Sequence, residues 1–323
     1  AAAGCRWRSN HVARGLAANG KETLTIDSLK RTTWNFFSGT QLTFGPGAVG
    51  TLASLIARRS SGRILLVTDE VLRDAGVVSH AEVAMSQTSA GVEIFSGGEV
   101  EPSTETVDQL LDTARTFEPD LIVALGGGSN MDLAKACVAS LGSDRSTESM
   151  FGFDHVPHPA PTRPALVCLP TTSGTGSEMT HSAILKSPET GKKAAILSQY
   201  IRPEIAIVDP QLALSCPANV TAESGIDALT HAIEAYLVTN FYSFHEDFEK
   251  GLPYEGNHPL GDMYAEKAIS LIGRHLQRAV EEPENLAARS GMSFAATLAG
   301  AAFSSCGVSL AHALEYPIGS TYQ

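Results

Sequence analysis

The sequence has no C-x-x-C pair, no surplus of basic residues and no apolar run long enough to span a bilayer. The five cysteines are scattered, which favours a reducing compartment over a disulfide framework, and we expect a cytoplasmic protein. The net charge of -12 leaves no basic footprint for nucleic acid and argues against an anionic membrane as a partner. The remaining composition is typical of a folded soluble protein.

A length of 323 residues suggests about two domains. Residues 1–30 are rich in alanine and carry Arg6, Arg8 and Arg14 before the first acidic residue, Glu22. We expect this stretch to be a disordered extension. The alternative is an organelle transit peptide, which would place the protein in the mitochondrial matrix.

From residue 34 onward, short apolar runs alternate with helical patterns. The runs that predict strands are 41–44, 63–69, 91–95, 120–125, 165–169 and 205–209. Continuous apolar runs such as 63–69 are typical of parallel strands buried on both faces. After Pro210 only helical patterns follow, interrupted by a loop at 240–261. We therefore predict an α/β domain over 31–215 and an all-helical domain over 216–323.

Two of the predicted strands end in loops rich in glycine and hydroxyl groups. The stretch 126–135 joins a strand to a helix, where backbone N–H groups at the positive helix end suit a pyrophosphate. It lacks the G-x-G-x-x-G spacing, so the alternative is a tight turn. The second loop, 170–178, also follows a strand, and ligands of open α/β sheets bind beyond the carboxyl ends of strands. Two such loops favour a nucleotide site over a solvated linker.

The stretch 224–236 is a predicted helix that places Asp227 and His231 four residues apart on one face. An apolar stripe on the same helix suggests that the pair points inward; the stripe contains Ile226, Leu229, Ile233 and Leu237. A carboxylate that faces the interior needs a cation or several donors. The pair suits a first-row divalent metal. The alternative is an aspartate that holds a core histidine by a hydrogen bond.

Together these motifs resemble the iron-containing (group III) alcohol dehydrogenase family. The motifs are 126–129 with Asp132 and Lys135, 170–178, 225–234 and 312–319. The stretch 254–262 resembles the longer branch of the family, which includes hydroxyacid–oxoacid transhydrogenases. The resemblance implies a dehydroquinate synthase-like fold, with an α/β dinucleotide-binding domain followed by an all-helical metal-binding domain.

The resemblance also implies roles for individual residues. Three match metal ligands, through which catalysis would proceed: Asp227, His231 and His312. Nine residues are expected around the cofactor. They are Gly127, Gly128 and Ser129 at the pyrophosphate, Thr171, Thr172 and Thr175 near the nicotinamide, and Asp132, Lys193 and Asp69. Asp69 matches the acid that bonds the adenosine ribose, and its carboxylate would favour NAD over NADP by repelling a 2′-phosphate.

The activity that the resemblance implies is reversible hydride transfer between NAD and a primary alcohol or hydroxy acid. The expected metal is Fe²⁺, alternatively Zn²⁺, and the expected assembly is a homodimer or larger homo-oligomer. The family's fourth ligand is a downstream histidine, and none follows His312 here. We therefore expect either an incomplete C-terminal end or an open site. Tyr316 stands where some relatives have a second histidine credited with proton shuttling. The alternatives are a dehydroquinate synthase-like lyase and a non-catalytic NAD-binding protein.

Overall fold

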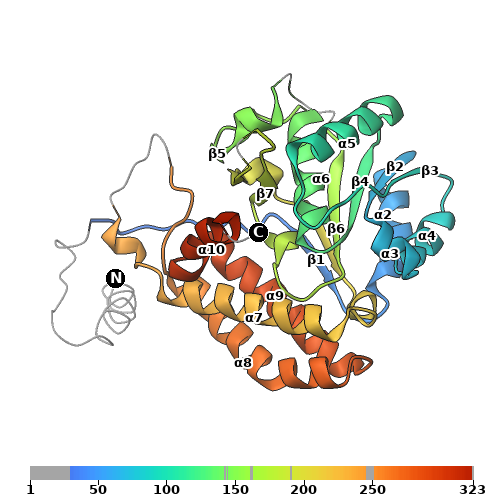
Figure 1. Cartoon of the computed structure of the whole chain (residues 1–323). Coiled ribbons are helices and arrows are strands. Elements are labelled where there is room, and N and C mark those ends of the chain that lie inside the picture. The colour runs from blue at the N-terminus through green and yellow to red at the C-terminus, as the bar shows by residue number, and fades with distance from the viewer. Residues whose placement is uncertain are drawn as a thin grey trace, which may run out of the picture.

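The computed structural model describes residues 30–141, 143, 145–160, 163–189, 191–244 and 251–321. The expected N-terminal extension lies almost entirely outside these residues. An α/β unit stands above a group of packed helices, and the C-terminal helix lies beside the junction between them (Figure 1). Among the described residues, no helix combines the length and apolarity that crossing a bilayer requires.

The α/β unit is built on a six-stranded parallel sheet with the order β1-β9-β6-β4-β2-β3. Its strands are β1 (Gln41–Phe44), β2 (Arg63–Val67), β3 (Gly91–Phe95), β4 (Leu121–Gly126), β6 (Ala165–Pro170) and β9 (Ile205–Val208). The six predicted strands are therefore confirmed. A second, three-stranded sheet contains β5 (Gly152–Phe153), β7 (Ser182–Lys186) and β8 (Lys193–Leu197), of which β7 and β8 are antiparallel.

Helices cover both faces of the parallel sheet, which explains the continuous apolar runs. They are α2 (Thr51–Arg59), α3 (Glu70–Asp74), α4 (Val78–Ser86), α5 (Thr104–Phe117) and α6 (Gly128–Leu141). Successive residues of β2 alternate between two hydrophobic cores: Leu65 and Val67 pack with residues of α5 and α6, whereas Ile64 and Leu66 pack with residues of α2 and α4. The predicted α/β fold is confirmed.

The rest of the chain is helical, as predicted. Its helices are α7 (Ala218–Leu237), α8 (Pro259–Glu281), α9 (Leu286–Cys306) and α10 (Leu310–Thr321). Helices α7, α8 and α9 pack on one another, whereas α10 has few contacts with the others and lies across one end of α7 (Figure 1). The predicted domain boundary near residue 216 falls between the short 3₁₀ segment η6 (Pro210–Ala213) and α7.

Three of the four residues in the apolar stripe predicted to turn α7 inward face outward instead. Ile226, Ile233 and Leu237 are 53%, 38% and 70% exposed, whereas Leu229 is partly buried against the helical core. The helix buries mainly small residues, including Gly225, Ala228 and Ala232. That part of the prediction was wrong because tight helix packing selects small side chains, so large apolar residues did not mark the buried face.

Candidate metal and nucleotide site

Helix α7 presents a carboxylate and an imidazole from one face. Asp227 lies four residues before His231; His231 is buried, whereas the Asp227 side chain is 35% exposed. The Oδ2 atom of Asp227 lies 3.7 Å from Nδ1 of His231, which is too far for a hydrogen bond. Nδ1 is also buried with no hydrogen-bond partner. The alternative in which Asp227 simply hydrogen-bonds a core histidine is therefore not observed.

Helix α10 brings a third polar side chain to this pair. Nε2 of His312 lies 3.8 Å from Oδ1 of Asp227, and its ring stacks on the His231 ring with centroids 4.5 Å apart. Asp227, His231 and His312 each offer one ligand atom, and these atoms lie within 4.8 Å of one another. The structure thus brings together three residues whose sequence positions span 85 residues.

This donor set fits a divalent metal ion. Ligand atoms that share one ion at about 2.1 Å lie roughly 3–4 Å apart, which is close to the separations from Asp227 to the two imidazoles. A buried imidazole nitrogen without a partner is costly, and coordination would satisfy it. Two imidazoles and one carboxylate are donors that iron and zinc both accept.

Burial and charge act differently on the two histidines. Burial lowers the pKa of His231 to about 4, although Asp227 opposes the shift, so this imidazole is neutral at pH 7. Burial also acts to lower the pKa of His312, but the nearby carboxylates of Asp227 and Glu234 outweigh it and the pKa is raised. A metal ion at this site would therefore compete with a proton at His312 more than at His231.

Glu234 belongs to the same face of α7 and was not predicted as a site residue. It lies three residues after His231, and its carboxylate contacts Nδ1 of His312 at 2.6 Å. Burial acts to raise its pKa, but hydrogen bonds from Ser309, His312 and Ala311 dominate and the pKa is lowered. The signal available in the sequence was the spacing Asp227, His231, Glu234, which keeps all three on one helix face.

The two glycine-containing loops meet at the carboxyl ends of β4 and β6. A Cβ atom placed on Gly128 would lie 2.7 Å from Cγ2 of Thr175, and one on Gly127 would lie 3.5 Å from Oγ1 of Thr172. The amide of Thr171 donates to the carbonyl of Gly126 at 3.0 Å. Helix α6 begins at Gly128, so its first amides have no intrahelical partner and are available to an anion.

Asp132 and Lys135 hold the 170–178 loop and the residues after it through buried hydrogen bonds. Asp132 accepts hydrogen bonds from Ser177 Oγ at 2.7 Å and from the amide of Ile184 at 2.9 Å. The fully buried Nζ of Lys135 donates to Ser177 Oγ and Thr180 Oγ1, at 2.6 and 2.9 Å. Burial lowers the pKa of Lys135, and Asp132 opposes that shift. Both Asp132 oxygens are engaged within the protein, so its contacts are those of a support for the loops.

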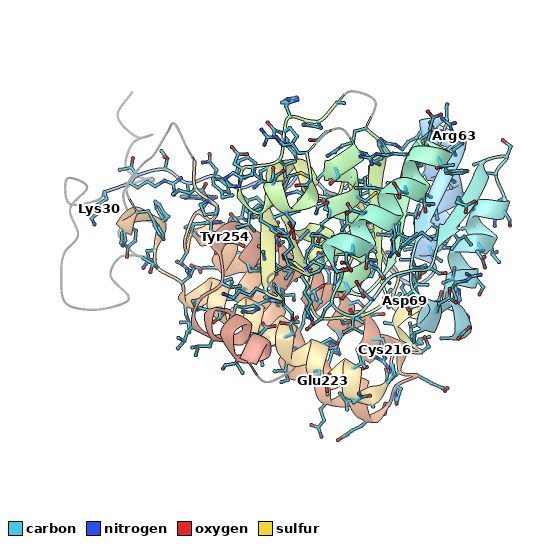
Figure 2. The ribbon with its side chains drawn as sticks, turned by 45° about the horizontal axis from the view of Figure 1, so that its top comes forward. Lys30, Arg63, Asp69, Cys216, Glu223 and Tyr254 are labelled. Carbon is cyan, nitrogen blue, oxygen red and sulfur yellow. The ribbon has the colours of Figure 1, made fainter. Side chains whose placement is uncertain are left out.

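Asp69 lies at the start of α3, just beyond the end of β2. Its Oδ1 atom accepts from the amide of Leu72 at 2.9 Å and caps α3, and its Oδ2 atom accepts from Nδ2 of Asn130 at 2.6 Å. Figure 2 labels Asp69 at the boundary between the α/β unit and the helices, well away from Tyr254. Asp69 is not among the residues that line the cavity described next, whereas Tyr254 is.

One cavity of about 700 Å³ joins the two halves of the site. Its lining includes residues from the loop side and from the helical side; those predicted from the sequence are Gly128, Ser129, Asp132, Thr175, Lys193, Asp227, His231 and His312. Nζ of Lys193 lies 2.9 Å from Oε1 of Glu101 at the cavity wall. Gly127, Thr171 and Thr172 are not among the lining residues, and the side chain of Tyr316 lies outside the described part of the chain.

Comparison with known families gives two matches that together cover most of the sequence. Residues 39–210 match the family described as iron-containing alcohol dehydrogenase. Residues 221–323 match the C-terminal region of the Fe-containing alcohol dehydrogenase family. The two matched ranges correspond to the α/β unit and to the helices that follow it.

Two curated relatives illustrate the similarity. Long-chain-alcohol dehydrogenase 1 of Geobacillus thermodenitrificans (strain NG80-2) is 35% identical over 278 residues, which cover 86% of this chain and 66% of that protein. The mitochondrial hydroxyacid-oxoacid transhydrogenase of Caenorhabditis briggsae is 32% identical over 292 residues, which cover 86% of this chain and 61% of that protein. The chain thus spans between three fifths and two thirds of the length of these relatives.

Solved structures agree with this picture. A 1,3-propanediol oxidoreductase superposes with a TM-score of 0.82 at 32% identity, covering 90% of this chain and 71% of the other. A sulfoacetaldehyde reductase from Bifidobacterium kashiwanohense, solved in complex with NAD+, superposes with a TM-score of 0.78 at 29% identity, covering 89% and 71%.

Proposed function

This chain belongs to the iron-containing alcohol dehydrogenase family, and from that premise we propose that it transfers a hydride reversibly between NAD and a primary alcohol or hydroxy acid. The observation that carries the proposal is the single cavity lined by both the Gly128–Thr175 loop contact and the Asp227, His231 and His312 cluster. Hydride transfer needs donor and acceptor carbons in contact, so the two subsites must share one space.

We propose that Asp227, His231 and His312 hold the metal ion, with Fe²⁺ expected for this family and Zn²⁺ compatible with the same donors. When bound, such an ion supplies a Lewis acid for a substrate oxygen. The protein's own contribution is to keep the His231 imidazole neutral and desolvated and to supply one carboxylate charge. The unpartnered Nδ1 atom of His231 supports this assignment.

We propose that NAD occupies the loop side of the cavity. The amides at the start of α6, at Gly127, Gly128 and Ser129, would bind its pyrophosphate, and Thr175 and Lys193 would lie near its nicotinamide half. When bound, NAD supplies the hydride-accepting carbon. Thr171 and Thr172 would act by holding the neighbouring loop, as would Asp132, whose oxygens already bond Ser177 and Ile184.

Selection of NAD over NADP would depend on Asp69. Its position at the carboxyl end of β2 supports this role, because nucleotides bind beyond that edge of a parallel sheet. The hydrogen bond from Asn130 would keep the carboxylate in one orientation. Binding of NAD and NADP to the Asp69→Ser variant tests this role: affinity for NADP should rise relative to NAD.

An absorbance assay tests the activity directly. The purified chain, loaded with Fe²⁺ or Zn²⁺, is incubated with NAD and a panel of primary alcohols, diols and hydroxy acids, and NADH formation is followed. We expect NADH with at least one of these substrates, and none with the Asp227→Asn variant. A lyase of the dehydroquinate synthase type would give no net NADH. Absence of bound metal and of NADH under all conditions would instead support a non-catalytic NAD-binding protein.

We further propose a homodimer or larger homo-oligomer in a reducing compartment, either the cytoplasm or the mitochondrial matrix. The scattered cysteines support such a compartment, and the transhydrogenase relative is named as mitochondrial. The net charge of -12 supports the absence of nucleic-acid and anionic-membrane partners. Light scattering coupled to size-exclusion chromatography would measure the oligomeric state.

A further inference from the structure

The carboxylate of Glu234 is buried between two helices that the metal cluster also joins. Glu234 is 6% exposed and follows His231 by three residues and Asp227 by seven, so it lies on the face of α7 that carries the cluster. A buried carboxylate without donors is costly, and all the donors that contact this one come from the start of α10.

Three of these donors cap α10. The amide of Ser309 donates to Glu234 Oε2 at 3.1 Å, its hydroxyl donates to Oε1 at 3.2 Å, and the amide of Ala311 also donates to Oε1. Amides in the first turn of a helix have no intrahelical partner, and this end of a helix is positive. The first turn of α10 has no acidic residue, so Glu234 supplies the negative charge at this helix end as well as acceptors for its free amides.

The fourth donor is the imidazole of His312. Nδ1 lies 2.6 Å from Oε2 of Glu234, so Nδ1 carries the proton in this contact and Nε2 keeps its lone pair. Nε2 lies 3.8 Å from Oδ1 of Asp227, on the side of the cluster. A histidine whose second nitrogen donates to a carboxylate has a fixed tautomer and a fixed ring orientation.

Among the described residues, few other contacts hold α10 in place. Its described apolar side chains Leu310, Leu314 and Ile318 are 70%, 48% and 54% exposed. These described side chains therefore bury little apolar area where α10 meets α7, and among the described contacts the polar ones with Glu234 dominate the docking. Loss of the Glu234 hydrogen bonds should therefore increase the mobility of both α10 and the His312 side chain.

We propose that Glu234 is a positioning residue that docks α10 on α7 and presents Nε2 of His312 to the metal ion, so that metal binding and docking of α10 are coupled. This inference rests on the metal centre of the proposed function and requires no assumption about substrate or cofactor. Without Glu234, His312 would have to be ordered at the moment of metal binding, and the affinity would fall by that cost.

Cobalt titration of the full chain tests the proposal. Co²⁺ binding is measured by calorimetry and by visible absorption for the wild type, Glu234→Gln, Glu234→Ala and Glu223→Gln. Glu223 is an exposed residue of the same helix, labelled in Figure 2, that lies one turn before Asp227 but does not line the cavity, so its substitution makes a matched charge change outside the cavity lining. We expect affinity losses of about 10-fold for Glu234→Gln and about 100-fold for Glu234→Ala, with no change for Glu223→Gln.

Hydrogen exchange gives a readout that a general loss of stability would not mimic. In the wild type, Co²⁺ should slow exchange of the α10 amides while leaving α8 and α9 unchanged. In Glu234→Ala, the α10 amides should exchange fast with or without Co²⁺. Ser309→Ala removes one capping donor but leaves the contact with His312, so it should speed exchange in α10 while weakening Co²⁺ binding less than Glu234→Gln does.

The outcomes separate this inference from the proposed function. If both Glu234 variants bind Co²⁺ as tightly as the wild type, the positioning role is overturned and the metal centre stands. If the wild type itself binds no Co²⁺, the metal centre fails and this inference fails with it. Should Glu234→Ala not fold, Glu234→Gln decides, because it keeps the side-chain shape while it removes the charge and one of the two acceptor oxygens.

Discussion

The two walls of the cavity are held together by different means. On the loop side, β4 and β6 are fully buried, and the loops that follow them rest on the buried ammonium group of Lys135. On the helical side, the described leucine and isoleucine side chains of α10 are exposed, and the helix depends on the polar contacts of Glu234. The loop wall is thus held by buried contacts that need no ligand. On the helical wall, we expect the docking of α10 to depend on a bound metal ion.

Replacing Lys135 should have the largest effect, because it removes the centre of the loop wall. Lys135→Met would leave Asp132, Ser177 and Thr180 without their buried cation, and we expect the free energy of unfolding to fall by about 3–5 kcal/mol. Urea unfolding followed by circular dichroism measures this change.

The same substitution at an exposed position is the control. Lys267 lies on the surface of α8, and Lys267→Met should change the free energy of unfolding by less than about 0.5 kcal/mol. A loss below about 1 kcal/mol for Lys135→Met would contradict the view that the loop wall depends on this network.

Acidification should lower the free energy of unfolding through His181, which lies where the α/β unit contacts α9. His181 contacts Ser304 of α9 and the carbonyl of Pro253, and burial lowers its pKa to about 3, below the ordinary value of 6.5. Below pH 6.5, His181 therefore binds a proton in the unfolded chain but stays neutral in the folded chain until the pH approaches 3. Stability is fully present above pH 6.5 and falls as the pH decreases, by about 2–3 kcal/mol at pH 4.5 for this residue.

Unfolding of the metal-free chain between pH 7 and pH 4.5 measures this loss. The glutamine of His181→Gln offers an acceptor and donors in similar positions but does not titrate. The free energy of unfolding of this variant should therefore decrease less between pH 7 and pH 4.5. His80→Gln, on the surface of α4, should leave it unchanged. Parallel pH profiles for wild type and His181→Gln would show that other groups cause the loss.

A smaller effect is expected where backbones of the two walls touch. A Cβ atom placed on Gly300 of α9 would lie 2.5 Å from the carbonyl oxygen of Gly176, in the loop that contains Thr175. Gly300→Ala should therefore destabilise the chain by about 1–3 kcal/mol. Gly273 of α8 has no atom near such a Cβ, so Gly273→Ala should stabilise by about 0.5–1 kcal/mol. Thermal unfolding distinguishes these opposite signs, and equal signs would argue against a close backbone contact in solution.

The loop wall was more predictable from sequence than the helical wall. Strands such as 63–67 are short, apolar and bounded by turns, so local pattern identifies them, and the loops at their ends then lie at one edge of the sheet. The Asp227 and His231 pair was found because the spacing of four residues is also local. Each of these signals is made by residues that are close to one another in the sequence.

The errors on the helical wall share a different cause. Glu234 was missed because its donors lie 75 to 78 residues away, at the start of α10. The exposed stripe on α7 was misassigned because that helix packs through alanine and glycine. On the other side of the cavity, the hydrogen bond from Asn130 to Asp69 was likewise not visible without the fold, because 61 residues separate the two. For Glu234 and Asp69, a contact between distant segments decides the role of the residue.

The outward stripe of α7 gives the smallest predicted effect and tests that correction. Leu237 is 70% exposed, so Leu237→Gln should change the free energy of unfolding by less than about 0.5 kcal/mol. Ala235, two residues earlier and fully buried, is the matched position: Ala235→Gln inserts the same side chain into the packed face and should cost about 1–3 kcal/mol. Urea unfolding at two protein concentrations separates the cases. A loss above about 1 kcal/mol for Leu237→Gln that grows with protein concentration would mean that a second copy covers this face, because only contacts between chains depend on concentration.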